Sequence, residues 1–505
     1  MEGRDDPRGS AVRRGRSLSR TAGAHRRDGG DPRRGCAGRQ GLRAPRPRAR
    51  RIRCEGRSGG RGSRSGASGG AARREAGARD RRGASGDPET ARRTASHGDR
   101  SGRRCGGRQG EGSGSATRAL VWAGVNELAV EQVEDPTILN AHDAIVRVRL
   151  TTTCGSDLHL LGGYVPTMRA GDVLGHEFIG EIVETGSEVK NHRVGDRVVV
   201  CSFISCGKCW YCKNELYSLC DNSNPNAGIP EMLWGQAPGG CYGYSHALGG
   251  WAGSHAEYIR VPYADQGAFT VPDGVSDERA LFASDAAPTG WMGADLGGVR
   301  PGDTVAVWGA GGVGQMAARA AILLGAERVI VIDRFQERLG QVEQVIGAET
   351  MNYETSEVLA ELRETTGGRG PDVCIEAVGM EAHRDRPDFA YDQLKQQLRL
   401  QTDRPTAVRE AIFAARKGGS VFVLGVFGGF VDKFPLGPLM NKGLTLRFAQ
   451  QHGHRYIPML LERMARDELA TEHLATHVMP LDEAPAGYGM FKEKTDGCVR
   501  AVFRP

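Results

Sequence analysis

Four cysteines within one fifteen-residue stretch constrain this chain more than any other feature of its sequence. Two, two and seven residues separate them, and a short loop with this spacing can place four thiolates around one tetrahedral Zn²⁺. The four are Cys206, Cys209, Cys212 and Cys220. The sequence has no export signal and no apolar run long enough to span a bilayer, so we expect a cytoplasmic protein with reduced cysteines. The stretch therefore predicts a closed structural zinc site.

The first 115 residues differ in composition from everything that follows. They contain 31 Arg against 12 Asp and Glu, a net charge of +19, and they lack Lys, Phe, Tyr and Trp. Since the whole chain carries +6, residues 116–505 carry −13. A segment with so few apolar side chains cannot offset its ordering entropy, so we expect residues 1–115 to be disordered.

Three explanations of this basic extension stay open. It could be a tail that binds nucleic acid or acidic surfaces, a transit peptide, or an upstream extension of the reading frame that the mature protein lacks. We favour the last, because the segment has no aromatic residues to stack on bases and more acidic residues than a transit peptide.

The globular part begins with short strands and glycine-containing turns, which predict a small β-barrel-like domain. We expect strands over 119–122, 144–150, 181–185, 196–200 and 255–261. The stretch 221–254 is rich in Gly, Asn and Pro and is expected to be a long loop.

From about residue 284 the pattern changes to alternating strands and helices, which predicts a parallel, doubly wound sheet. The first unit is a strand over 304–308, an Ala-rich helix over 313–324 and a strand over 329–332. Further strands are expected over 373–377, 420–424, 443–447 and 497–502, and helices over 406–415 and 456–466. The last strand would return to the first domain, and the polar stretch 380–403 is an insertion or lid-like helix without an assigned place.

A glycine-rich turn directly follows the first strand of this unit and opens its helix. It fits the pattern G-x-G-x-x-G, whose glycines let the backbone approach a pyrophosphate at the positive end of a helix. The residues of the turn are Gly309, Gly311, Gly312, Val313 and Gly314. Asp333 ends the next strand, where a carboxylate accepts hydrogen bonds from a ribose and repels a 2′-phosphate. We therefore expect NAD rather than NADP. Arg334 and Arg338 lie close by and weaken this preference, because their positive charges attract a phosphate.

A second group of possible metal ligands precedes the four cysteines. A catalytic zinc needs fewer protein ligands than a structural one because the substrate must occupy an open position. Cys154 and His176 form the obvious pair of ligands. Ser156 and His159 would supply a hydroxyl and an imidazole that carry a proton towards solvent. Glu177 would place a carboxylate near the metal, as a neighbour of the ligands or as an exchanging ligand.

These motifs together resemble the zinc-containing medium-chain alcohol dehydrogenases over residues 116–505. The resemblance implies a GroES-like β-barrel catalytic domain, a Rossmann doubly wound parallel sheet and two Zn²⁺ per chain. In that family a cysteine just before the cofactor domain is the usual third ligand of the catalytic zinc, but here Asp285 occupies that position. An aspartate there resembles the glutathione-independent formaldehyde dehydrogenase branch, as do residues 242–246 and the long 221–254 loop. In that branch an insertion shields bound NAD.

The resemblance also implies roles for individual side chains. Ser156 would take the proton of the substrate hydroxyl and pass it through the nicotinamide ribose to His159. Thr289 would pack beside the nicotinamide. Arg500, a basic residue near the C-terminus, would contact the pyrophosphate.

Four segments are therefore expected along the chain. They are a disordered extension (1–115), a GroES-like catalytic domain with a structural zinc lobe (116–283), a Rossmann NAD-binding domain (284–440) and a C-terminal segment that returns to the catalytic domain (441–505). The expected function is hydride transfer between a small alcohol or aldehyde and NAD, carried out by a homo-oligomer, either a dimer or a tetramer.

Two alternatives remain within enzymes: a formaldehyde dismutase with tightly bound NAD, and a polyol or amino-alcohol dehydrogenase. A third alternative belongs to another class, a nucleic-acid-associated protein that uses the basic extension, and we do not expect it.

Overall fold

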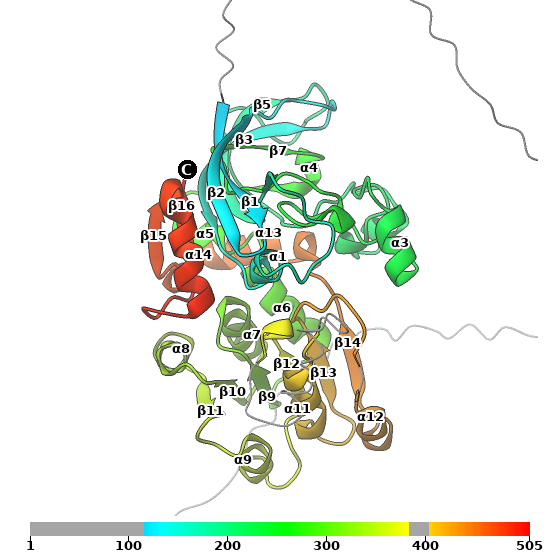
Figure 1. Ribbon diagram of the computed structural model, residues 1–505. Coiled ribbons are helices and arrows are strands. Elements are labelled where there is room, and N and C mark those ends of the chain that lie inside the picture. Colours follow the sequence, from blue (N-terminus) through cyan, green and yellow to red (C-terminus); the bar gives the residue numbers. More distant parts are fainter. Residues whose placement is uncertain (1–115, 383–402, 432) are drawn as a thin grey trace, which may run out of the picture. The chain divides into compact units, whose positions relative to one another are not determined.

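The computed structural model describes residues 116–382, 403–431 and 433–505, which fall within one compact unit (Figure 1). The expected disorder of residues 1–115 and most of the unassigned stretch 380–403 lie outside these residues. Within the described part, no helix combines the length and the apolar character needed to cross a membrane.

Six parallel strands form the sheet of the second half of this unit. In spatial order they are β11 (Glu349–Asn352), β10 (Arg328–Asp333), β9 (Thr304–Trp308), β12 (Val373–Glu376), β13 (Ser420–Val423) and β14 (Thr445–Phe448). The chain thus starts in the middle of the sheet, builds to one edge and then returns to build the other. This is the strand order of a doubly wound dinucleotide-binding fold, and it confirms the predicted Rossmann sheet.

Helices cover both faces of this sheet because its strands are apolar on both sides. They are α6 (Ala286–Gly297), α7 (Gly312–Leu323), α8 (Gln336–Gln341), α9 (Val358–Thr365), α11 (Thr406–Ala414), α12 (Leu436–Lys442) and α13 (Ile457–Ala465). Along β9, Val305 and Val307 pack in one buried cluster with α6, α7 and α13, whereas Ala306 and Trp308 pack in another with α9 and α11. The alternation of side chains along a strand therefore divides the core into two layers.

The first half contains a seven-stranded sheet and a three-stranded sheet. The larger runs β15 (His477–Pro480), β16 (Ala501–Arg504), β3 (Ala144–Thr152), β5 (Glu177–Thr185), β6 (Arg197–Val200) and β8 (Ala268–Thr270), with β7 (Tyr258–Val261) also paired to β3. The smaller runs β2 (Glu127–Glu134), β1 (Ala116–Gly124) and β4 (Asp172–Val173). Their strands pair antiparallel except for β15 and β16, which pair in parallel, and the two sheets confirm the predicted β-rich catalytic half. Since β16 pairs with β3, the end of the chain belongs to the same sheet as its beginning.

Short helices connect these strands, and α2 among them carries Cys212 of the four-cysteine run. They are α1 (Asp157–Leu161), α2 (Trp210–Lys213), α3 (Gly228–Trp234), α4 (Ala264–Gly267) and α5 (Asp277–Leu281), and α14 (Ala484–Glu493) packs beside β16.

Three expected boundaries need correction. The Rossmann sheet does not end at residue 440, because β14 is its last strand and runs from Thr445 to Phe448. The strand expected over 497–502 begins only at Ala501, since Gly497 adopts a φ of 64° and turns the chain. The stretch 221–254 is not a continuous loop, because it includes α3.

Candidate active site

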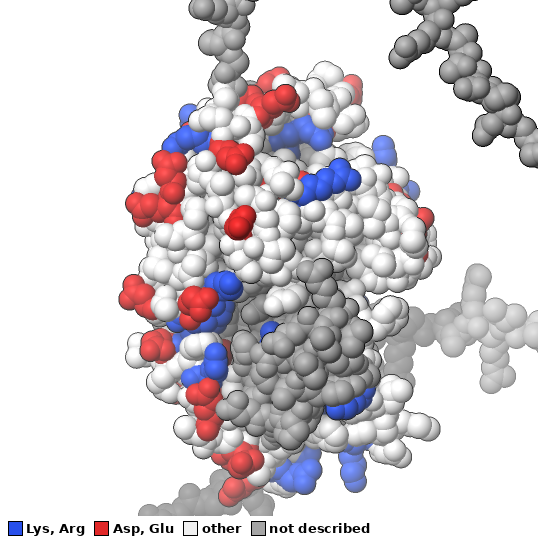
Figure 2. All heavy atoms as spheres, viewed as in Figure 1, with Lys and Arg blue, Asp and Glu red and all other residues white. Residues whose placement is uncertain are grey.

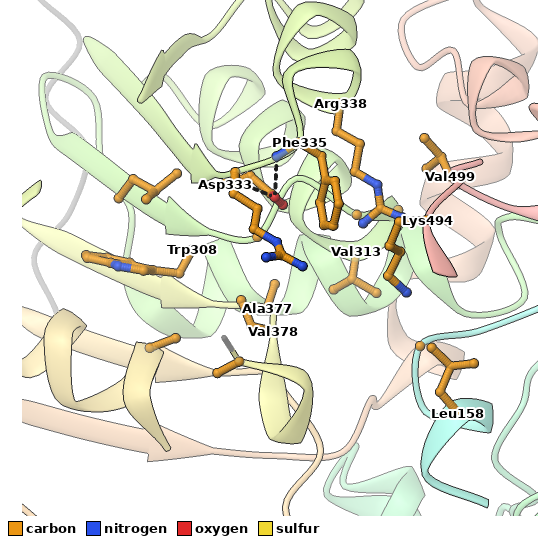
Figure 3. Close-up of a pocket in the computed structure, with 18 of the residues that line it drawn as sticks. Leu158, Trp308, Val313, Asp333, Phe335, Arg338, Ala377, Val378, Lys494 and Val499 are labelled. Atoms are coloured by element: carbon orange, nitrogen blue, oxygen red, sulfur yellow. Dashed lines mark hydrogen bonds between the residues drawn. The ribbon is translucent and has the colours of Figure 1, made fainter. Parts of the chain in front are cut away.

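A cavity of about 410 Å³ opens at the C-terminal ends of β9, β10 and β12 (Figure 3). Most residues expected to contact the cofactor line it, and Gly314 and Thr289 do not; those that do are Gly309, Gly311, Gly312, Val313, Asp333, Arg334, Arg338 and Arg500. Gly314 instead faces the strand, because a Cβ atom at this position would lie 1.8 Å from the carbonyl oxygen of Gly309. Gly309 itself adopts a φ of 101°, which side chains disfavour.

The glycine turn forms a cradle between two guanidinium groups. A Cβ atom on Gly311 would lie 3.9 Å from Arg338, and one on Gly312 would lie 2.8 Å from Nε of Arg500. Because both residues are glycines, the space beside them stays open. This space lies next to two cations and at the N-terminus of α7, where backbone N–H groups point outward. A dianionic pyrophosphate fits this cradle.

Asp333 is 8% exposed and held by the backbone around it. Its Oδ2 accepts a hydrogen bond of 2.7 Å from the N–H of Ala310, and its Oδ1 accepts one of 2.6 Å from the N–H of Arg334. Arg334 and Arg338 both stack on the ring of Phe335, at 4.7 and 5.3 Å from its centroid. Figure 3 shows Asp333 and Arg338 on either side of this ring, with Lys494 reaching towards the same cavity.

A second, smaller cavity of about 110 Å³ adjoins the first. Both are lined by Gly155, Val313, Ala377 and Val378. The smaller cavity alone contacts the predicted reactive side chains, namely Cys154, Ser156, His159, His176, Asp285 and Thr289. A dinucleotide that fills the first cavity can thus present its reactive end to a molecule in the second.

Cys154, His176 and Glu177 form a cluster of ligand type in which one donor atom of each lies within 4.8 Å of the others. Burial opposes ionisation of the Cys154 thiol, but Arg500 and His176 outweigh it and lower its pKa to about 7. Thiolate, imidazole and carboxylate are the donors that Zn²⁺ prefers in proteins, so this set fits a zinc ion.

Asp285 lies at the start of α6, and its Oδ2 is 4.0 Å from Nε2 of His176. Ser202 donates a hydrogen bond of 2.6 Å to the same oxygen, and Gln451 donates one of 2.7 Å. Thr289 donates to the other oxygen at 2.9 Å. The sequence did not identify Ser202 or Gln451, because neither belongs to a local motif.

Glu177 and Arg500 form an ion pair of 3.1 Å between two almost fully buried side chains. Burial raises the pKa of Glu177 well above its ordinary value, although Arg500 opposes this. Arg500 also donates to the carbonyl oxygen of Thr153. The guanidinium expected at the pyrophosphate therefore lies between the glycine turn and the carboxylate next to His176.

A buried hydrogen-bond chain extends from His176 away from the cavity. Asp157 lies 3.1 Å from Nδ1 of His176 and accepts hydrogen bonds from the N–H of Cys154 at 2.8 Å and the hydroxyl of Tyr488 at 3.1 Å. His255 lies 2.8 Å from the same hydroxyl. Asp157 could have been suggested by its place beside Cys154, but Tyr488 and His255 carry no such signal because they come from distant segments.

The residues expected to move a proton line the small cavity. Ser156 Oγ lies 3.4 Å from both Sγ of Cys154 and Nε2 of His176. His159 lies one turn further along α1 and is only 2% exposed. The imidazole thus lines the cavity and is almost entirely shielded from bulk solvent.

Glu376 is a further carboxyl group that the sequence analysis missed. It is fully buried at the end of β12, and burial raises its pKa to about 7. Its Oε1 accepts hydrogen bonds from the N–H groups of Val378 at 3.0 Å and Gly379 at 2.7 Å. Since Val378 lines both cavities, this carboxyl group shapes the wall between them.

The four cysteines of the lobe come together as their spacing predicts. Their sulfur atoms lie within 4.8 Å of one another, and none of the four forms a disulfide. Backbone and amide N–H groups donate to them, including Asn222 Nδ2 to Cys206 at 3.2 Å and Cys206 N to Cys220 at 3.3 Å. Such donors stabilise thiolates, so the cluster fits a closed zinc site.

Two family models match the chain. The Alcohol dehydrogenase GroES-like domain matches residues 140–273, and Zinc-binding dehydrogenase matches residues 312–390. The first match lies within the β-rich half, and the second begins at the N-terminus of α7 in the Rossmann half.

Named relatives match over the same globular part. The uncharacterized zinc-type alcohol dehydrogenase-like protein AdhB of Bacillus subtilis is 38% identical over 391 residues, which cover 77% of this chain and 100% of that protein. A glutathione-independent formaldehyde dehydrogenase of Bacillus subtilis is 33% identical over 417 residues, covering 75% of this chain and 94% of the relative. The solved structure of alcohol dehydrogenase TADH from Thermus sp. ATN1 is 36% identical with a TM-score of 0.64, covering 77% of this chain and 99% of that one.

Proposed function

The chain belongs to the zinc-type alcohol dehydrogenase family and is therefore a zinc- and NAD-dependent oxidoreductase, and we propose its reaction on that basis. The proposal is that it transfers a hydride between a small primary or secondary alcohol, or the corresponding aldehyde or ketone, and NAD. One observation carries it: a small cavity lined by Cys154, His176 and Asp285 shares four lining residues with a dinucleotide-sized cavity.

Cys154, His176 and Asp285 are the proposed ligands of the catalytic zinc, with Glu177 as an alternate ligand. When bound there, zinc supplies a Lewis acid that lowers the pKa of an alcohol hydroxyl. The four cysteines of the lobe would hold a second, structural zinc, which makes two per chain.

The chain's own residues would orient the substrate and move its proton. Ser156 is close enough to the ligand cluster to accept the hydroxyl proton at its Oγ and pass it on towards His159. Val313, Ala377 and Val378 form an apolar wall where the two cavities meet, which excludes water from the hydride path.

The small volume of the cavity beside the proposed zinc ligands indicates a small substrate. Its volume of about 110 Å³ leaves little room beyond the reacting atoms, and much of its wall is apolar, including Phe203, Leu248 and Leu424. NAD is the proposed cofactor form rather than NADP, since the Asp333 carboxylate would repel a 2′-phosphate.

Replacing Tyr488 by phenylalanine is expected to weaken zinc binding at the catalytic site by up to about tenfold, because partners one step beyond the ligands orient them. The change removes one donor to Asp157 and leaves His255 without the hydroxyl it contacts, while the packed ring remains. Competition with a chelator measures the affinity. Tyr211→Phe, which removes an exposed hydroxyl, is the control, and equal affinities in the two variants would contradict this role.

A homo-oligomer in the cytoplasm is proposed for this enzyme. β14 is the edge strand of the Rossmann sheet, and the neighbouring α12 buries none of its residues. Leu436, Met440 and Phe448 of these elements are 68%, 85% and 51% exposed, as expected of a surface that another copy covers. The mass of the protein in solution tests this proposal.

None of the residues assigned to this function lies in the basic extension. The nucleic-acid alternative depended on residues 1–115, and the family match supports the oxidoreductase instead. Figure 2 shows acidic and basic side chains interspersed over the coloured part of the face in view.

The test is NADH absorbance of the zinc-loaded protein with formaldehyde, with a panel of short alcohols, and with NAD or NADP. Substrate-dependent NADH formation only when NAD is added supports the dehydrogenase. Loss of formaldehyde without added NAD and without NADH accumulation would instead favour a dismutase with recycling cofactor. Activity on polyols or amino alcohols alone would favour the remaining alternative.

A further inference from the structure

The segment 450–454 lies between the four-cysteine lobe and the candidate active site. It begins two residues after the end of β14 and leads through a short turn of helix at Gly453–Arg455 into α13. Gln451, His452 and His454 are all buried, with at most 5% of their surfaces exposed. Buried polar side chains outside a regular element are costly unless they are paired, so their partners indicate what this segment does.

The histidines of the segment contact the lobe. Ser218, two residues before Cys220, lies 3.0 Å from Nδ1 of His452, and its hydroxyl donates to the carbonyl oxygen of Gln450 at 3.1 Å. Ser205, next to Cys206, lies 2.9 Å from Nε2 of His454. The lobe thus contacts the segment through residues at both ends of the cysteine run.

The lobe also contacts the segment 450–454 through an aromatic ring. The ring of Tyr217 stacks on His454 with centroids 4.8 Å apart.

Burial lowers the pKa of His452 to about 4 and that of His454 to about 3. Both imidazoles are therefore neutral near pH 7 and act as fixed hydrogen-bond partners rather than as charges.

Gln451 turns the other way, towards the active site. Its Nε2 donates to Oδ2 of Asp285 at 2.7 Å and contacts the hydroxyl of Ser202, which binds the same oxygen. One peptide bond therefore separates a contact with the lobe, at His452, from a contact with the carboxylate at Asp285. Displacement of the histidines would move the glutamine with them.

We propose that Gln451 is a positioning residue for Asp285, and that the four-cysteine lobe holds it in place through His452 and His454. The lobe then contributes to the catalytic site across the junction with the Rossmann half, besides stabilising its own loop. This inference rests on the proposed function, in which Asp285 is a zinc ligand. A carboxylate ligand with one oxygen held by two donors is fixed in orientation, and such partners tune the bound metal.

Two kinds of variant test the two ends of this connection. Gln451→Met keeps the length of the side chain and removes the donor to Asp285. The double variant Ser205→Ala, Ser218→Ala removes the two hydroxyls through which the lobe contacts the histidines. Tyr263→Phe is the matched control, because it removes a lobe hydroxyl that contacts the carbonyl oxygen of Asn222 instead.

The readouts are kcat, KM, zinc content and the visible absorption spectrum of protein that carries Co²⁺ at the catalytic site and zinc in the lobe. We expect Gln451→Met and the double serine variant each to lower kcat by about tenfold and to shift the Co²⁺ bands. Both should retain the lobe zinc, and Tyr263→Phe should leave the bands and kcat unchanged. The combined variant should be no worse than Gln451→Met alone, because both changes act through one connection.

Additive losses of kcat, or unshifted Co²⁺ bands in the serine variant, would overturn the proposal. The spectrum also separates this inference from the proposed function. If the wild-type protein oxidises no alcohol of the panel, the proposed function fails, but the Co²⁺ bands still report whether the lobe positions Asp285.

Discussion

Cys154→Ser is expected to abolish alcohol oxidation, with kcat lowered by about a thousandfold, while NAD binding stays close to that of the unchanged protein. A metal acting as Lewis acid contributes several kcal/mol to such a reaction, and each 1.36 kcal/mol is a factor of ten in rate. Arg500 and His176 lower the pKa of this thiol to about 7, so it is the cysteine of the cavity best prepared to ligate as thiolate. A serine hydroxyl at the same position stays protonated and binds zinc weakly.

The measurements are turnover, zinc content and NAD affinity on the same preparation. Zinc content should fall from two ions per chain towards one, since the lobe site is untouched. Cys241→Ser is the control: this thiol also lines the small cavity, but burial raises its pKa to about 12, so it is not expected to ligate a metal. Turnover that persists in Cys154→Ser at full zinc occupancy, or equal losses in both variants, would contradict the assignment.

The sequence predicted those parts of the site that lie within short motifs. Cys154 and His176 lie 22 positions apart and were singled out by the residues beside them, whereas the glycine turn with Asp333 and the run of four cysteines combine residues that a turn or a neighbouring strand end brings together. Their chemistry could be inferred because their spacing fixes their geometry before the rest of the chain is considered.

The remaining part of the site depends on contacts between distant segments. Gln451 reaches Asp285 across 166 positions, and Tyr488 reaches Asp157 across 331. Neither a glutamine after a short edge strand nor a tyrosine in an amphipathic helix signals such a contact, because each residue type is common in both settings. Only the packing of the C-terminal elements against the first half selects them.

The domain boundary at residue 440 was wrong for a related reason. The edge strand β14 is short and largely exposed, with the pattern Thr445, Leu446, Arg447, Phe448, and it lacks the continuous apolar run of the central strands. A strand was expected over 443–447, but because an edge strand lacks the apolar run that marks a central parallel strand, its place in the Rossmann sheet could not be inferred. The segment that links it to α13 is also the one that joins the lobe to the catalytic site.

Gly314→Ala is expected to destabilise the protein by about 3 kcal/mol or more and to weaken NAD binding strongly. The added Cβ atom would lie 1.8 Å from the carbonyl oxygen of Gly309, a backbone atom that cannot move without displacing β9. Removing this clash requires α7 to move away from β9. Overpacked sites usually cost about 1–3 kcal/mol of stability even when side chains can adjust. Because the same turn forms the pyrophosphate cradle, any such movement opens it.

Gly340→Ala in α8 is the matched control, because no atom lies within 4 Å of its added Cβ. Alanine is favoured over glycine inside a helix by up to about 1 kcal/mol, so this variant should unfold at the same temperature as the unchanged protein or at a higher one. Thermal unfolding and NAD titration are compared for the two variants. A Gly314→Ala protein that matches Gly340→Ala in both measurements would mean that α7 and β9 do not need their close approach, and that the glycine turn does not set the cofactor site.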